Sequence, residues 1–457
     1  MSKKIFALLS LLVVASLLLA ACGGPDENET PEPVATEAPE ETEEPEETEA
    51  PEEPSVRYCE DGLEGETITY YSQAGVTGPL STILGTGFIG ALNDSIAEIN
   101  AAGGICGATV ELVLNDTQYD AEQEVAIYQQ VREDDPPPFS IATYSSTASV
   151  VLSPFVNEDK IVNFAAGLNA KAAYVPRNGY TVGIAPIYSD QFAGFLTFLS
   201  NNWDDVKPEV AGDDIVVGVI GWDHPFGEGA TTTEALAVAD SLGITVLPLE
   251  KHPLTADADM VVPLQSLAQQ GANVIYYQGL GPWTAAVIGT LHGMEMWDTM
   301  VVGGVNWAFN TDVLAQLGES APAMIGFYGV FPWLWWNDTD APGIQQALAA
   351  FEAGGYAETD KAISYLMSYA GVYAWADIVE HTINMVGFEN LTGETFMAAF
   401  QDLGLVSALG IYNMDVRGEN RAPNMAQIRQ VQFVDGEIQF VVIQDFTELP
   451  DTRPPEE

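Results

Sequence analysis

The chain decides its fold in three neighbouring stretches: TITYYS at residues 67–72, FIGALNDSIAEINA at 88–101 and TVELVL at 109–114. The first and third are short and rich in β-branched, aromatic and apolar residues, as strands are. The middle stretch is longer and has a helical pattern of apolar residues. Strand, helix and strand in this order form a βαβ unit, whose two strands lie parallel.

The same alternation continues outward from this unit. Further strands are predicted at 140–144, 161–164, 215–220, 244–248, 273–277, 300–303 and 325–330, with helices at 121–132, 191–201, 228–242, 260–270 and 284–292. The strand runs are nearly all apolar, as in parallel strands that are buried on both faces. One sheet with so many strands would be unusually large. The sequence therefore predicts an α/β protein with two doubly wound lobes.

In the last third of the chain, the regular alternation of strands and helices stops. Residues 361–386 predict one long, mostly apolar helix, and residues 392–403 predict another. Two strands at 427–433 and 437–443 flank Asp435-Gly436, a dipeptide typical of tight hairpins.

The N-terminus has the pattern of a secretory signal. Lys3 and Lys4 precede an apolar run over residues 5–19, which is shorter than the ~20 residues that span a bilayer. Small residues then lead to Cys22 in the sequence Leu-Ala-Ala-Cys. This resembles the bacterial lipoprotein signal, which implies that residues 1–21 are removed and that Cys22 is acylated. The mature protein is then held by lipid on the outer side of the cell membrane.

The segment that follows, residues 22–54, is predicted to be a disordered tether. Residues 25–54 hold fourteen acidic residues, seven prolines and no Lys or Arg, so they have little apolar surface to bury. The whole chain has 66 acidic and 14 basic residues. Without the tether acids and the two lysines of the signal, 52 and 12 remain, a balance of about −40. Such a charge excludes nucleic acid and anionic lipid surfaces as partners, because both are bound by Lys and Arg.

The three cysteines fit this compartment. Lipidation of Cys22 leaves Cys59 and Cys106, and a remaining pair outside the cytoplasm is expected to form a disulfide. The four histidines are scattered, and the cysteine spacing matches no zinc pattern. We therefore expect no metal and no cofactor.

Motifs of enzymes are missing from the sequence, which contains no G-x-S-x-G, no P-loop and no H-E-x-x-H. Polar residues that could bind a ligand occur instead directly after the predicted strands. Ser145-Ser146-Thr147 follows the strand at 140–144 and precedes a helix. In open α/β sheets ligands bind at the carboxyl ends of strands, although Ser and Thr also occur at this position simply as helix N-caps.

Several motifs together resemble solute-binding proteins of the branched-chain amino-acid type, the extracytoplasmic receptors of ABC importers. The similarity runs from about residue 66 to 445. The motifs that carry it are Thr77-Gly78-Pro79 to Gly90-Ala91, Glu98-Ile99-Asn100-Ala101-Ala102-Gly103-Gly104-Ile105, Asn115-Asp116-Thr117, Ser189-Asp190-Gln191 and Phe226-Gly227-Glu228-Gly229.

The resemblance implies two lobes of the type I periplasmic-binding-protein kind, joined by three crossing strands, with the ligand in the cleft. The lobes are expected at 55–187 with 332–407 and at 188–331 with 408–446, followed by a tail at 447–457. The protein is then a monomeric receptor rather than an enzyme. Its partners are a small polar solute, such as an amino acid or a related amide or carboxylate, and the permease subunits of an ABC importer. A sensory module of the same fold, signalling to a membrane receptor, is one alternative, and an enzyme on a similar scaffold is the other.

The resemblance also implies the ligand site. From the first lobe it implies Ser146, Thr147, Gly167 and Asn169, and from the second lobe Phe226, Leu280, Asn306 and Trp307. The acid that pairs with the ligand ammonium in the family aligns near Val305-Asn306, where this chain has no Asp or Glu. An unpaired buried ammonium is costly, which weakens the assignment of an α-amino acid as ligand. An amide, a urea-like compound, a carboxylate or another small metabolite then becomes credible. The tryptophans Trp333, Trp335 and Trp336 are expected to pack between the lobes, with a ligand wall as the alternative.

Overall fold

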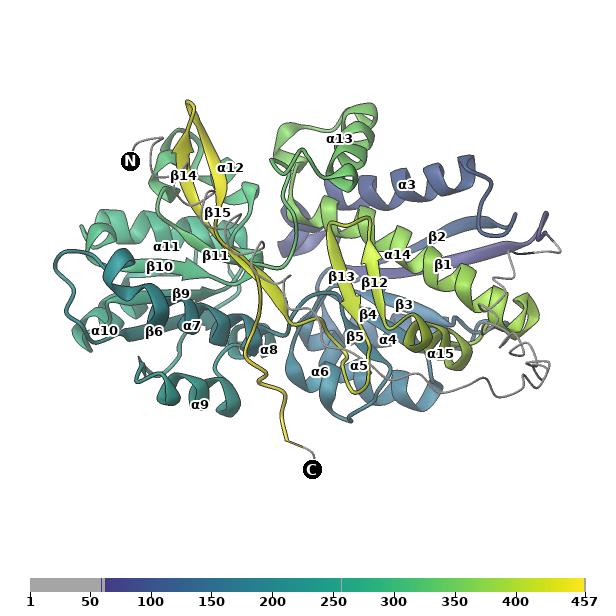
Figure 1. Ribbon diagram of the computed structural model, residues 1–457, viewed down its shortest axis with the longest axis horizontal. Helices are drawn as coiled ribbons and strands as arrows, with labels where there is room; N and C mark the ends of the chain where they lie inside the picture. Colours follow the sequence, from purple (N-terminus) through teal and green to yellow (C-terminus); the bar gives the residue numbers. More distant parts are fainter. Residues whose placement is uncertain (1–58, 60–61, 256, 456–457) are drawn as a thin grey trace, which may run out of the picture. The chain divides into compact units, whose positions relative to one another are not determined.

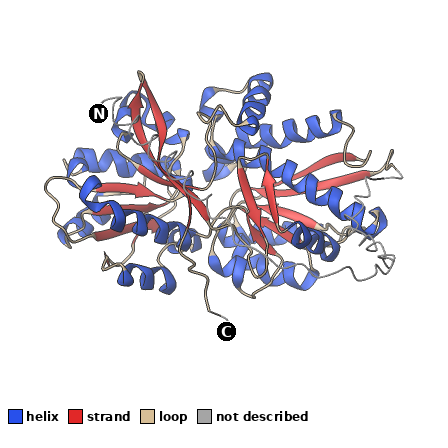
Figure 2. Cartoon of the chain, viewed as in Figure 1, coloured by secondary structure: helices blue, strands red, loops and turns tan. Residues whose placement is uncertain are grey.

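The structure is a computed structural model that describes residues 59, 62–255 and 257–455. The predicted signal, the tether and Cys22 lie outside these residues. The described chain forms α/β lobes in which helices cover the faces of a sheet (Figures 1 and 2). None of the described helices is both long enough and apolar enough to cross a lipid bilayer.

The first lobe is built on five parallel strands in the order β2-β1-β3-β4-β5. The strands are β1 (Thr67–Ala74), β2 (Thr109–Asp116), β3 (Ser140–Thr143), β4 (Val162–Ala165) and β5 (Thr181–Gly183). The long strand β1 pairs with β2 along its whole length and with β3 on its other side. Because all five strands run in one direction, the loops after them meet at one edge of the sheet.

Helices cover both faces of this sheet. They are α2 (Ser81–Leu84), α3 (Thr86–Ala101), α4 (Ala121–Val131), α5 (Ser146–Asp159), α6 (Ala170–Tyr174), α13 (Pro342–Gly354), α14 (Ile363–Val386) and α15 (Gly393–Leu403). The long helix α14 is apolar on most sides and buried along most of its length. Its Trp375 packs edge-on against Tyr70 of β1, with 5.0 Å between the ring centroids. On the opposite face, Tyr128 of α4 and Leu152 of α5 pack against Ile141 of β3.

The second lobe has an eight-stranded sheet in the order β15-β14-β11-β10-β9-β6-β7, with β8 also paired to β6. Its parallel part consists of β6 (Val216–Trp222), β7 (Thr245–Val246), β8 (Glu250–His252), β9 (Val274–Gln278), β10 (Val301–Gly304) and β11 (Tyr328–Phe331). Its helices are α7 (Tyr188–Val206), α8 (Pro225–Glu228), α9 (Thr233–Ser241), α10 (Val261–Gln269), α11 (Gly281–Gly293) and α12 (Thr311–Leu317).

The predicted hairpin is confirmed as β14 (Met425–Val434) and β15 (Glu437–Glu448). Asp435 and Gly436 have φ angles of 53° and 92°, the left-handed backbone that a two-residue hairpin turn requires. The hairpin adds to the parallel sheet because β14 pairs antiparallel with β11.

Other predicted elements differ from the structure. The strand expected at 244–248 shortens to Thr245–Val246, and a proline at position 248 cannot donate to a sheet ladder. The three-residue strand β5, helix α13 and the ribbon of β12 (Leu405–Ala408) with β13 (Tyr412–Asp415) were not predicted. Each of these strands is too short to show a hydrophobic period.

The chain crosses between the two lobes three times, at residues 184–187, 332–341 and 416–424. The second crossing carries the tryptophan cluster, which packs against aromatic neighbours. Trp335 stacks on Phe440 with 5.2 Å between centroids, and Trp336 meets Phe351 at 5.3 Å. These contacts favour the packing interpretation of the cluster.

A disulfide joins Cys59 to Cys106, with 5.1 Å between the Cα atoms. It connects the start of the described chain to the loop before β2. This is the pair predicted from the two cysteines that remain besides Cys22. The bond closes a loop of 47 residues, which in the chain-entropy account stabilises the fold by about 4 kcal/mol.

Candidate functional site

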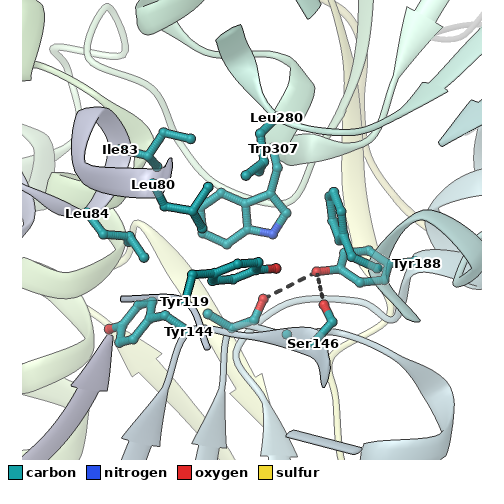
Figure 3. A pocket seen from close by; sticks show the side chains of 12 residues that line it. Leu80, Ile83, Leu84, Tyr119, Tyr144, Ser146, Tyr188, Leu280 and Trp307 are labelled. Carbon is teal, nitrogen blue, oxygen red and sulfur yellow. Dashed lines mark hydrogen bonds between the residues drawn. The ribbon is translucent and has the colours of Figure 1, made fainter. Parts of the chain in front are cut away.

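A small cavity lies where strand ends of the two lobes face each other (Figure 3). Its volume is about 30 Å³, and on this scale one water needs roughly 10–15 Å³. The lobes are therefore closed on a space for about two water molecules, and a larger solute enters only if they open. The lining residues are Leu80, Ile83, Leu84, Tyr119, Tyr144, Ser146, Ala166, Gly167, Tyr188, Phe226, Leu280 and Trp307.

Ser146 is the first residue of α5 and supplies a hydroxyl to the cavity. The helix starts here because Ser145, in extended backbone, accepts a hydrogen bond from the N–H of Ala148 at 3.2 Å. Ser146 Oγ lies 3.2 Å from the hydroxyl of Tyr188. The single proton of that hydroxyl is donated to the carbonyl of Ala166 at 3.4 Å, so Ser146 is the donor in its bond with Tyr188. Burial raises the pKa of Tyr188 to about 12, so its phenol is a neutral hydrogen-bond donor at physiological pH.

Gly167 follows β4 and lies directly against the turn that starts α5. A Cβ atom at position 167 would be 2.5 Å from the backbone N and Cα of Ser146. Only glycine permits this approach, so the loop after β4 and the N-terminus of α5 form one continuous wall of the cavity.

Thr147 and Asn169 are not among the lining residues and instead contact the other lobe. Thr147 Oγ1 lies 2.5 Å from Nε2 and 3.1 Å from Nδ1 of His224. The Asn169 amide donates to the carbonyl oxygen of Pro225 at 2.8 Å, while its oxygen accepts from the N–H of Lys171 and caps α6.

The second lobe brings three of its predicted residues to the cavity. Phe226 lies in α8 and meets Tyr188 edge-on at 4.9 Å between centroids. Leu280 is the N-cap residue of α11, and Trp307 lies in the short 3-10 helix over Asn306–Ala308. These positions follow β6, β9 and β10, three neighbouring strands whose carboxyl ends share one edge.

Asn306 is fully buried and does not line the cavity. Its backbone N–H donates to the side-chain oxygen of Gln191 at 3.2 Å. Within the described part of the chain, neither atom of its side-chain amide has a hydrogen-bond partner. Its assignment as a ligand contact stays a prediction, as do those of Thr147 and Asn169.

Sequence reasoning missed most of the apolar and phenolic wall. Tyr119 and Tyr144 follow β2 and β3, so their strand-end position was the available signal. The hydroxyl ends of Tyr119 and Tyr188 point toward one another beside Ser146 (Figure 3). Tyr144 turns its hydroxyl away, 3.3 Å from Ser368 of α14, and offers its ring to the cavity.

The cavity wall is neutral: of the described residues that line it, none carries a charged side chain. The buried carboxyl groups of the described residues lie outside the wall, and Glu124 and Asp312 are two of them. Glu124 of α4 accepts from the Thr117 hydroxyl at 3.0 Å, and its burial raises its pKa to about 8. Asp312 lies against Gly281 of α11, and burial raises its pKa to about 7. Among the residues that the structure describes, no cluster of three or more His, Cys, Asp or Glu side chains is arranged to hold a metal ion.

Two α/β lobes that close on a neutral cavity at their strand ends define a cleft-type binding protein. The chain belongs to the periplasmic binding protein family, whose sequence profile matches residues 74–437. The resemblance inferred from the sequence is thereby confirmed. As a member of this family, the protein is an extracytoplasmic solute-binding protein and not an enzyme.

Individual relatives are distant in sequence. Leu/Ile/Val-binding protein homolog 1 of Brucella abortus is 21% identical over 373 residues, which cover 80% of this chain and 91% of the relative. A branched-chain amino-acid ABC transporter protein of Thermus thermophilus, solved with bound valine, matches with a TM-score of 0.69 and 17% identity, over 84% of this chain and 97% of its own. A solute-binding protein of R. palustris in complex with 4-hydroxybenzoate matches with a TM-score of 0.68 and 19% identity, over 84% and 98%.

Proposed function

We propose that this protein is a lipid-anchored receptor that binds a small organic acid between its lobes and delivers it to an ABC importer. The observation that carries the proposal is the neutral cavity with a hydroxyl-rich helix start at one side and apolar rings around the rest. Ligand touches both lobes only when they close, so binding shifts the population toward the closed form. The permease of the importer then recognises and binds the closed form.

The acid group fits the wall formed by α5. Ser146 offers its hydroxyl, the first backbone N–H groups of α5 lie beside it, and the helix dipole favours an anion there. Tyr188 places a neutral phenol beside Ser146, and its single proton can turn from the carbonyl of Ala166 to the acid group. Charge-assisted bonds of this kind are the strongest that such a wall can make.

The opposite wall fits an apolar body without an ammonium group. Leu80, Leu280, Phe226 and Trp307 surround the remaining space, and none of the described lining residues is an acid that could pair with a cation. A buried unpaired ammonium would be strongly disfavoured. Although the Brucella and Thermus proteins are named for amino acids, this wall suits a monocarboxylate of the kind bound by the R. palustris protein.

The test compares acids with and without an amino group, and in one pair, 4-methylpentanoate and L-leucine, this group is the only difference. Thermal shift and titration calorimetry with 4-methylpentanoate, benzoate and 4-hydroxybenzoate should give larger responses than L-leucine and L-valine, because a tight ligand raises the melting temperature. Ser146→Ala should weaken binding of the best acid by ~1–3 kcal/mol, since an anion loses a donor. Ser241→Ala, on the exposed end of α9, is the control. Tighter binding of leucine than of 4-methylpentanoate would contradict this ligand class.

Lipid anchoring is the second part of the proposal and is supported by the signal pattern that ends at Cys22. Cys22→Ser removes the thiol that would carry the lipid, so the variant should leave the membrane fraction and appear in the soluble extracytoplasmic fraction. Detection by immunoblot after cell fractionation measures this. A variant that still sediments with membranes would argue against the anchor.

A further inference from the structure

His224 reaches from the second lobe into the first without lining the cavity. It precedes α8, and its ring contacts the Thr147 hydroxyl of α5 through the nitrogens described above. The same ring lies over Tyr119, which follows β2, with 5.9 Å between centroids and 27° between ring planes. One imidazole therefore bonds to one first-lobe residue and stacks on another.

The residues next to His224 make further contacts beside the one between His224 and the first lobe. The carbonyl oxygen of Pro225 accepts from the Asn169 amide, and Phe226 meets Tyr188 edge-on. On its own side the segment is held by Gln278 of β9, whose amide donates to the carbonyl of Phe226 at 3.1 Å. Residues 224–226 are named the clasp from here on. His224 and Pro225 bind the first lobe at two successive positions, and Phe226 packs on Tyr188, where α7 begins after the first crossing.

We propose that His224 is the positioning residue of lobe closure. Its bond to Thr147 and its stacking on Tyr119 hold the lobes together and so set how slowly a bound solute is released. The effect on solute release rests on the proposed binding function. The contacts that carry the proposal join one lobe to the other and are present without a solute.

Tyr119 couples the clasp to the cavity because it belongs to both. One part of its ring lines the cavity, and the ring also stacks on His224. A solute that contacts Tyr119 and fixes its ring therefore stabilises the stacking of Tyr119 on His224. When the cavity is empty or poorly filled, the Tyr119 ring is free to move and the stacking is weaker.

Closure should depend on the charge of His224. Burial in the closed form lowers the pKa of the ring, and Glu228 and Asp223 oppose this effect. Both carboxylates are paired with Lys251. The first lobe faces the ring with the Thr147 hydroxyl and the Tyr119 ring, and nearby Asp120 caps α4. The first eight residues of α5 carry no charge. Since protonation is disfavoured in the closed form, acid should open the lobes.

The test measures the distance between the lobes in the full chain without added solute. Spin labels at Gln130→Cys in α4 and Ser241→Cys in α9 report the distance by pulsed electron spin resonance. The doubly labelled protein should show a closed population that decreases from pH 7.5 to pH 5.5. His224→Ala and Thr147→Val should each lower the ratio of closed to open molecules about fivefold, the effect of losing one hydrogen bond of ~1 kcal/mol.

Two further variants separate a clasp from a general structural role. His224→Gln keeps a side chain that can bond to Thr147 and cannot titrate, so it should retain part of the closed population and lose its pH dependence. His292→Gln, at the exposed end of α11, should match the wild type. A distance distribution that is unchanged in His224→Ala, or a pH response that persists in His224→Gln, would overturn the proposal.

Adding solutes distinguishes this proposal from the proposed ligand class. Stopped-flow release of 4-hydroxybenzoate or 4-methylpentanoate should be faster from His224→Ala than from the wild type by a similar factor. If neither acid binds but the label distances respond as expected, the ligand class is wrong and the clasp stands. If the acids bind and the distances do not respond, the clasp is wrong and the ligand class stands.

Discussion

Gly167→Ala is expected to weaken solute binding at least tenfold. The added methyl would lie 2.5 Å from backbone atoms of Ser146 and 2.6 Å from the carbonyl carbon of Ser145. Backbone cannot yield as the end of a flexible side chain can, so the loop after β4 and the N-terminus of α5 must separate. A loss of tenfold or more in affinity, at least ~1.4 kcal/mol, should follow, with about 1–3 kcal/mol of stability lost to overpacking.

A matched glycine controls for this substitution. Gly289 lies in the middle of α11, and a Cβ there would meet no atom within 4 Å. Gly289→Ala should leave affinity unchanged and stabilise the fold by up to about 1 kcal/mol through helix propensity. Calorimetry with the best acid and urea unfolding measure both effects. Equal affinity in the two variants would mean that the α5 turn does not hold the solute.

The fold should be more stable in mild acid than in mild alkali. Burial raises the pKa of Glu124 to about 8 and the pKa values of Asp190 and Asp312 to about 7. A carboxyl whose pKa is raised by folding stabilises the native state fully below its unfolded pKa, near 4, and loses that stabilisation as pH rises through the folded pKa. The free energy of unfolding should therefore fall between about pH 4 and pH 8, with each group contributing up to ~1.4 kcal/mol per pH unit.

Glu124→Gln tests the largest of these contributions. Glutamine keeps the size of the buried acid and an oxygen that accepts from Thr117, and it cannot ionise, so the slope of stability against pH should decrease. Glu122→Gln, an exposed acid on the same helix, removes the same formal charge and controls for repulsion across this acidic protein. Urea midpoints at pH 5, 6, 7 and 8 give the slopes. A slope that is the same in both variants would show that Glu124 is not the titrating group.

The alternation of strands and helices could be predicted from the sequence because parallel strands are buried on both faces and so read as apolar runs. Residues 273–277 show this pattern and overlap the fully buried β9, while residues 67–72 and 109–114 lie within β1 and β2. The three-residue strand β5 could not be predicted, because nothing in so short a stretch separates a strand from a loop.

The candidate site was only partly accessible to the same reasoning. Strand ends and family motifs pointed to Ser146, Gly167 and Phe226, which lie around the cavity. Tyr188 could not be placed, because it starts α7 directly after the first crossing and reaches the cavity only through the way the lobes meet. The orientation of Thr147 toward His224 likewise depends on the contact between the lobes and not on any local pattern.

The three crossings also have a consequence for how the molecule assembles as it is made. Neither sheet lobe is a continuous stretch of chain: α14, whose Trp375 packs on Tyr70 of β1, begins about 180 residues after β5 ends. The sheet of the second lobe is likewise incomplete until β14 has been synthesised, because β14 pairs with β11. During synthesis from the N-terminus, the first sheet therefore emerges long before the helix that covers it. Both lobes complete their cores nearly together, in the last quarter of the chain, whereas domains made of continuous chain fold one after another.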